Sequence, residues 1–254
     1  HYLAKGGNLN AMIAEIYGKA TGCCKGRGGS MHLIDRKVGF EGSTAIVGNT
    51  IPIGVGLGLS KKISKKKSIS VVYCGDGSVE EGVFYESINF AATKKIPVLF
   101  VCENNSYSVY SPLSVRQPEG RKIHEMVKGM GVDSAYEDGN DIRKVYRLTK
   151  RAISKIYETG NPFFMELQTY RWREHCGPNY DNNIGYRSEE EFLEWKKRDP
   201  IKLFEKKLLK EKICTKGEIR RINKEVLGQI KEAFNFAKSS PFPDPSEAFE
   251  SMFA

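Results

Sequence analysis

Two apolar runs that each end in a polar string constrain the fold of this chain most strongly. Residues 68–74 are rich in Val, Ile and Tyr and end at Gly75-Asp76-Gly77, and the apolar run 96–102 is followed by Asn104-Asn105. Short apolar runs of this kind are typical of buried parallel strands. Between them, residues 79–95 carry apolar side chains near helical spacing. The pattern predicts a strand, a helix and a second strand.

The two polar strings are expected to meet in space. A right-handed crossover makes the strands parallel, so both exit at the same edge of the sheet, where open α/β sheets bind ligands. Asp76 and Asn105 would supply the oxygen ligands that Mg²⁺ prefers. Gly77 and Ser78 would open the following helix, where free N–H groups favour phosphate oxygens. Either string alone is also an ordinary turn or loop, and it is the pair that favours a magnesium diphosphate site.

The rest of the chain predicts an α/β protein with a doubly wound, mostly parallel sheet and a helical C-terminal tail. A helix after Pro52 places Gly54 and Gly58 on one face, where another helix could pack closely. The loop at 170–183 would leave a third strand at the same edge as Asp76. Capping boxes open two tail helices. The expected helices include 8–18 and 141–159, the third strand is 162–169, the loops are 19–44 and 106–124, and the boxes are Ser188 with Glu191 and Thr215 with Glu218.

Composition limits the partners and the compartment. The chain has 254 residues with 40% hydrophobic content, enough for one large core, and a net charge of +9. The excess lysines are scattered, without a recognition helix or zinc spacing, so no nucleic-acid partner is predicted. Six cysteines without paired spacing except Cys23-Cys24 indicate a reduced, cytoplasmic setting. No apolar run reaches the roughly 18 residues of a membrane span. Because the chain begins at His1, we expect residues upstream, and a targeting segment there stays open.

The Gly-Asp-Gly and Asn-Asn strings resemble the thiamine diphosphate motif. Along nearly its whole length the chain resembles the α subunit of the first component of 2-oxo acid dehydrogenase complexes, of the pyruvate and acetoin dehydrogenase type. The segments that carry the resemblance are GRGGSMHL (26–33), AIVGNTIPIGVGLGL (45–59), VCENNSY (101–107), TYRWREH (169–175), YRSEEEFLEWKKRDPI (186–201) and SPFPDPSE (240–247). The resemblance implies a thiamine diphosphate-binding α/β domain at 1–185 and a helical extension of it at 186–254.

The resemblance also implies a role for particular residues. Asp76, Asn105 and the main-chain carbonyl of Tyr107 match the Mg²⁺ ligands, and Gly77 and Ser78 match residues that touch the diphosphate. Two further positions, Ala45 and Val47, match backbone that faces the aminopyrimidine ring, and His175 matches the active-site histidine of a mobile loop. Here that loop reads Glu174-His175-Cys176, where the family often has Gly-His-Ser. The role of His32, in the glycine-rich loop, is left open.

The implied activity is oxidative decarboxylation of a 2-oxo acid, with pyruvate favoured, and acyl transfer to a lipoyl group. It implies thiamine diphosphate and Mg²⁺ as cofactors, a β subunit in a heterotetramer of two α and two β chains, and a lipoyl acyltransferase as a further partner. Alternatives are an acetoin dehydrogenase α subunit, a half-transketolase, suggested by Glu80-Glu81-Gly82, and a cofactor-binding subunit without turnover. A nicotinamide dehydrogenase is disfavoured, because Gly54, Gly56 and Gly58 lack the required spacing.

Overall fold

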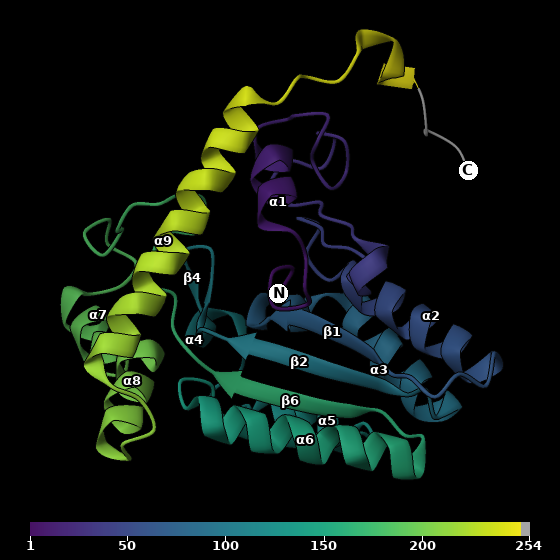
Figure 1. Cartoon of the computed structure of the whole chain (residues 1–254). Helices are drawn as coiled ribbons and strands as arrows, with labels where there is room; N and C mark the ends of the chain where they lie inside the picture. Colours follow the sequence, from purple (N-terminus) through teal and green to yellow (C-terminus); the bar gives the residue numbers. More distant parts are fainter. Residues whose placement is uncertain (250–254) are drawn as a thin grey trace. The chain divides into compact units, whose positions relative to one another are not determined.

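A four-stranded parallel sheet forms the centre of the larger part of the molecule. The computed structural model describes residues 1–249. The strands are β1 (Ser70–Gly75), β2 (Val98–Asn104), β5 (Asp133–Asp138) and β6 (Phe163–Gln168), in the order β1-β2-β6-β5. The predicted strands at 68–74, 96–102 and 162–169 are confirmed within a few residues. The carboxyl ends of β1, β2 and β6 all point toward α4 (Leu113–Arg116) (Figure 1).

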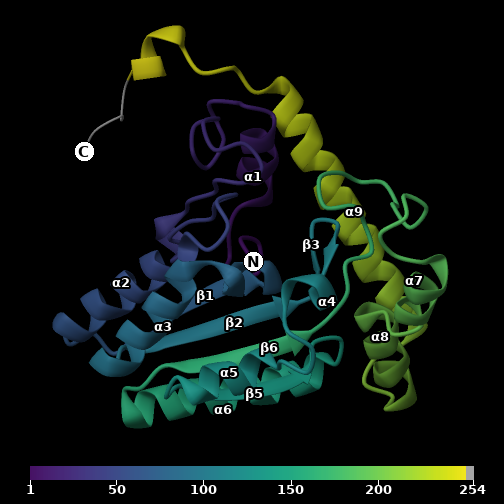
Figure 2. The same ribbon diagram turned by 180° about the vertical axis from the view of Figure 1, so that it is seen from behind.

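Helices cover both faces of this sheet (Figures 1 and 2). Helices α2 (Thr50–Ile63), α3 (Gly82–Lys94) and α5 (Ile123–Gly129) pack one face, in a core that contains the fully buried Phe84, Phe100 and Phe164. Helix α6 (Ile142–Thr159) packs the opposite face. The predicted doubly wound, mostly parallel α/β fold is therefore confirmed.

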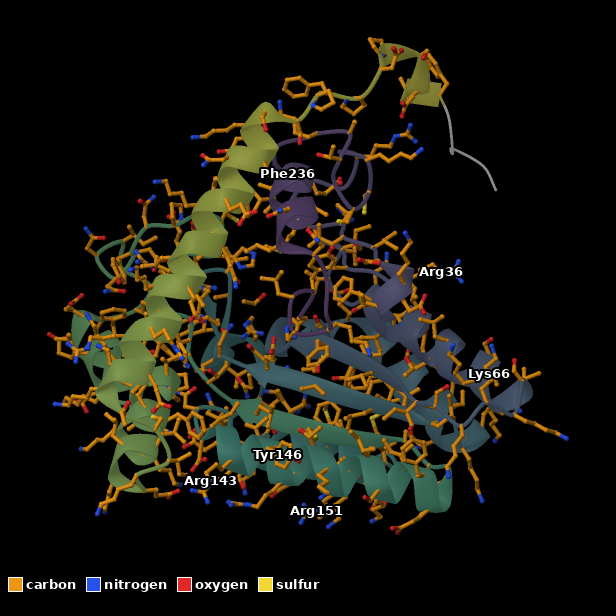
Figure 3. All side chains as sticks on the ribbon, viewed as in Figure 1. Arg36, Lys66, Arg143, Tyr146, Arg151 and Phe236 are labelled. Carbon is orange, nitrogen blue, oxygen red and sulfur yellow. The ribbon has the colours of Figure 1, made fainter. Side chains whose placement is uncertain are left out.

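The sequence of α6 explains its position on the sheet. Asp141 caps its first turn by accepting hydrogen bonds from the backbone N–H groups of the second and third residues that follow it. Leu148, Ala152 and Ile156, spaced four apart, are buried against β2 and β6. Charged and aromatic residues lie on the side turned away from the sheet, among them Arg143, Tyr146 and Arg151 (Figure 3).

The chain divides into two compact units. Val47–Lys210 contains the sheet together with β3 (Tyr107–Ser108), β4 (Ser111–Pro112), α4, α7 (Glu189–Lys196) and α8 (Pro200–Lys210). His1–Ile46 with residues 211–249 forms the other, where α1 (Leu9–Ile16) packs on α9 (Lys216–Ser239). Small and branched side chains make that contact: Ile13, Ala14, Ala233 and Ala237. The domain division predicted at residue 185 stays a prediction.

A short 3-10 helix, η2 (Asp76–Glu80), lies between β1 and α3. The prediction that Gly77 and Ser78 open the α-helix is therefore wrong, because α3 begins only at Gly82. The glycine-rich turn tightens into a 3-10 helix first, which is common at helix N-termini. Asp76 is thus the first residue after the strand and the first of η2.

The glycines of α2 pack against strands and not against another helix, which corrects the expectation from the sequence. A Cβ built on Gly54 would lie 2.0 Å from Cγ2 of Val72 in β1, and one on Gly58 would lie 2.6 Å from Cγ2 of Val98 in β2. The four-residue spacing does place both glycines on one face of α2, and that face packs against the sheet. Pro52 lies within the first turn of the helix, where proline is tolerated.

We expect Gly54→Ala to destabilise the protein by about 2 kcal/mol, because the added methyl would overpack the contact with Val72. The matched control is Gly56→Ala in the same helix, where no heavy atom lies within 4 Å of the added Cβ. That change should stabilise the protein by about 0.5–1 kcal/mol through helix propensity. Urea unfolding of both variants measures the difference. Equal free energies of unfolding would contradict the packing argument.

No helix within residues 1–249 combines the length and the apolar character that crossing a membrane requires.

Candidate functional site

Asp76 and Asn105 meet at the carboxyl ends of β1 and β2, as the sequence predicts. The backbone N–H of Asn105 donates to Oδ1 of Asp76 at 3.1 Å, and the Asp76 side chain is only 1% exposed. Strand β2 runs two residues further than expected, so Asn104 is its last residue and Asn105 the first beyond it. The parallel pairing of β1 with β2 is what brings the two exits together.

Successive side-chain turns shape the loop after β2. Oδ1 of Asn104 accepts from the N–H of Ser106, and Oδ1 of Asn105 accepts from the N–H of Tyr107, both at 3.0 Å. Ser106 is held at φ +68°, a left-handed conformation that non-glycine residues seldom adopt. The hydrogen bonds keep this turn closed and direct the chain into β3.

A buried carboxylate supports Asn104 from the neighbouring strand. Glu166 of β6 is 4% exposed, and its Oε1 accepts from Nδ2 of Asn104 at 2.8 Å. Its Oε2 lies 2.6 Å from Nδ1 of His124 and accepts from the backbone N–H of the same residue at 2.9 Å. Both carboxylate oxygens therefore have partners, as a buried charge requires. This network fixes the amide of Asn104, and with it the start of the loop.

The side chain of Tyr107 anchors the other end of the loop. Its hydroxyl donates to the carboxylate of Glu191 in α7, with oxygens 2.7 and 2.9 Å away, and its ring packs on Tyr170 and Tyr186. Burial, followed by this hydrogen bond, raises the pKa of Tyr107 well above its usual range. The segment 186–201, which carries part of the family resemblance, thus holds the residue whose carbonyl is a predicted metal ligand.

The same contact corrects one predicted capping box. Ser188 does cap α7, and its Oγ accepts from the N–H of Glu191 at 3.1 Å. The Glu191 side chain, however, bonds to Tyr107 and not back to Ser188, because the tertiary contact takes it. The box of Thr215 and Glu218 at the start of α9 is complete, which confirms that prediction.

Arg116 is the member of the site that the sequence did not indicate. It comes from the end of α4, and its guanidinium forms ion pairs with Asp76 and with Glu80 of η2. Its Nε donates to the carbonyl of Ser111 at 3.0 Å, and its side chain is 10% exposed. A cation is thus already accommodated beside Asp76. Only its place within the predicted polar loop 106–124 could have suggested this residue.

His175 lies in the predicted loop beyond β6 and is exposed. The tip of the loop is closed by Glu174, whose Oε1 accepts from the N–H and the Nδ2 of Asn179, at 3.1 and 2.8 Å. Farther along, Asp181 pairs with the buried Arg187. Within residues 1–249 no hydrogen bond or ion pair joins His175 to Asp76 or Asn105, and its role stays a prediction.

Comparison with known proteins decides the family. A profile of the dehydrogenase E1 component matches residues 1–246. The chain belongs to the dehydrogenase E1 component family. Its relatives in the family include the pyruvate dehydrogenase E1 component subunit alpha of Rickettsia felis, 35% identical over all of this chain and 76% of the relative. The α subunit of the acetoin:2,6-dichlorophenolindophenol oxidoreductase of Bacillus subtilis is also 35% identical, over all of this chain and 74% of the relative.

A chloroplastic member of the family, pyruvate dehydrogenase E1 component subunit alpha-3 of Arabidopsis thaliana, is 32% identical over all of this chain and 60% of the relative. These matches confirm the predicted membership among 2-oxo acid dehydrogenase α subunits, a family of enzymes whose cofactor is thiamine diphosphate. Because relatives come from bacteria and from a plastid, the cytoplasmic setting stays a prediction.

Within this E1 chain the predicted site residues fall into two groups. One compact unit holds η2, the loop after β2 and β3, which carry Asp76, Gly77, Ser78, Asn105 and Tyr107. Val47 begins that unit, whereas Ala45 belongs to the other, which ends its first segment at residue 46. Both are in irregular backbone before α2.

Cys23 and Cys24 lie near the buried Glu15. The carboxylate of Glu15 already accepts backbone N–H groups from Cys24, Gly26 and Gly28 at 2.6–2.9 Å. Burial raises the pKa of the Cys24 thiol to about 11, which keeps it protonated near neutral pH. The Glu15 carboxylate therefore closes the loop that contains Cys23 and Cys24.

Proposed function

We propose that this chain is the α subunit of a pyruvate dehydrogenase E1 component. With a β subunit it would catalyse thiamine diphosphate- and Mg²⁺-dependent oxidative decarboxylation of pyruvate and pass the acyl group to a lipoyl group. The observation that carries the proposal is the junction of Asp76 and Asn105 at the ends of adjacent parallel strands, in a chain matched by the E1 family along residues 1–246.

The residues present fit a metal-bound diphosphate. Asp76, Asn105 and the carbonyl of Tyr107 are the hard oxygen donors that Mg²⁺ takes, and the ion pair of Arg116 with Asp76 supports a preference for positive charge at this point. A Cβ on Gly77 would lie 2.5 Å from Oγ of Ser108, so only glycine leaves room between η2 and β3. The backbone of Gly77 and Ser78 would face the diphosphate.

The remaining roles are proposed from the family resemblance. Thiamine diphosphate supplies a carbon nucleophile and then accepts the electron pair left by decarboxylation. The backbone at Ala45 and Val47 would contact the aminopyrimidine ring. His175, exposed at the tip of its loop, would orient or protonate the reacting substrate and assist transfer to the lipoyl group. His175→Ala should therefore lower lipoyl acylation, measured with a lipoyl domain as acceptor.

The assembly and the alternative substrate complete the proposal. We propose a heterotetramer of two α and two β chains that delivers its product to a lipoyl acyltransferase. An acetoin dehydrogenase α subunit is the second candidate, because the Bacillus subtilis relative is as similar to this chain as the Rickettsia felis relative.

Co-expression with a cognate E1 β subunit tests the proposal. The purified complex should reduce an artificial electron acceptor with pyruvate, in the presence of thiamine diphosphate and Mg²⁺, and the single chain should not. Activity with acetoin alone would support the second candidate. Decarboxylation by the single chain would contradict the need for a β subunit, and ketol transfer between sugar phosphates would replace the proposal with a transketolase.

A further inference from the structure

Arg116 and a divalent cation would both bind the carboxylate of Asp76. Oδ1 of Asp76 accepts from the N–H of Asn105, and Oδ2 forms the ion pair with Arg116. The guanidinium is permanently charged at any pH the protein meets. A divalent cation on Oδ2 would therefore stand within a few ångströms of a unit positive charge, in a site where Asp76 is 1% exposed and screening by water is weak. The two cations would therefore compete for the Asp76 carboxylate.

Several contacts besides Asp76 hold the Arg116 side chain in place. Glu80 accepts from its Nη1, and Ser111 accepts from its Nε at 3.0 Å. The next residue, Gln117, is buried and donates through Nε2 to the same Oε1 of Glu80 at 3.1 Å. Glu80 thus holds both Arg116 and its neighbour, and the end of α4 is fastened to η2 by charge and by hydrogen bonds.

We propose that Arg116 is an internal cation that competes with Mg²⁺ for Asp76. The inference rests on the proposed function and adds a positioning residue to it. Metal binding displaces the guanidinium from Asp76 and loosens the contact of α4 with η2, so the affinity for the metal is set partly by the strength of the Arg116 ion pairs. Glu80 also lowers the affinity for the metal, because its ion pair holds the Arg116 guanidinium beside Asp76.

Binding of Mn²⁺ to the purified chain, followed by the electron paramagnetic resonance signal of the free ion, tests this inference. Arg116→Gln should bind Mn²⁺ about tenfold more tightly than the unmodified chain, since removing a charge-assisted bond of this kind changes binding by about that factor. Glu80→Gln, which keeps Arg116, should give a smaller gain of the same sign. Lys122→Gln is the matched control. Lys122 lies six residues away and pairs with the exposed Glu125 at 3.0 Å.

Weaker or equal binding by Arg116→Gln overturns the inference. Equal binding by all these variants, lost in Asp76→Asn, overturns it while leaving the metal site intact. Absence of Mn²⁺ binding in every variant overturns the metal site as well. If Arg116→Gln does not fold, Glu80→Gln alone decides, and a loss or absence of change in its affinity contradicts the proposal.

Discussion

Replacing Asp76 with Asn is expected to abolish the stabilisation of this protein by thiamine diphosphate and Mg²⁺. At about a hundredfold excess over the dissociation constant, binding should add about 2.7 kcal/mol to the free energy of unfolding, which corresponds to about 5–8 °C in Tm for a chain of this size. Under the proposed assignment Asp76, directly after β1, would supply the charged metal ligand, and the isosteric amide removes that charge. Differential scanning fluorimetry with and without both ligands measures the shift.

The ligand-induced shift, and not the Tm itself, is the decisive quantity. Asp76→Asn also removes one of the two charged partners of Arg116, so the variant should start from a lower Tm. Glu86→Gln, on the exposed surface of α3, removes the same charge elsewhere and should leave the shift unchanged. A full shift in Asp76→Asn would refute the assignment of the metal ligand, whatever its activity.

The meeting of Asp76 with Asn105 could be predicted from the sequence because its causes are local and topological. Each strand is a short apolar run, each run ends in a distinctive polar string, and the handedness of the crossover makes the strands parallel. None of these steps depends on a side chain elsewhere in the chain. The hydrogen bond from the N–H of Asn105 to Asp76 follows from the exits of two adjacent parallel strands.

Residues that join the site through tertiary contacts could not be predicted in this way. Arg116 follows a loop without periodicity, and Glu191 carries a capping signature that the hydroxyl of Tyr107 overrides. Strand β5, with the sequence DSAYED, has no continuous apolar run, because it is the edge strand and is only partly buried. Local sequence patterns do not show which distant residue a side chain will contact.

Asp181→Asn is expected to destabilise the protein by about 3 kcal/mol near neutral pH. Asp181 is 3% exposed, and it pairs with Arg187, whose side chain is fully buried and would keep an uncompensated charge in the variant. Tyr186 also donates to Asp181, at 2.6 Å. These residues close the loop that carries His175, so the same substitution should lower activity of the complex. Urea unfolding at pH 7 measures the loss of stability.

The loss of stability in Asp181→Asn should become smaller as the pH falls. Burial alone would raise the pKa of the Asp181 carboxyl, but hydrogen bonds from Tyr186 and Arg187 outweigh burial and lower it. A carboxyl whose pKa is lower in the folded than in the unfolded state, where it is about 3.9, stabilises the protein above that pH. The difference between the unmodified protein and Asp181→Asn should therefore be complete at pH 5–7 and shrink below about pH 4. Glu194→Gln, which breaks an exposed pair with Lys197, should cost less than about 0.5 kcal/mol throughout. If the difference in free energy of unfolding did not change with pH, the shape of the Asp181 side chain, and not its charge, would stabilise the loop.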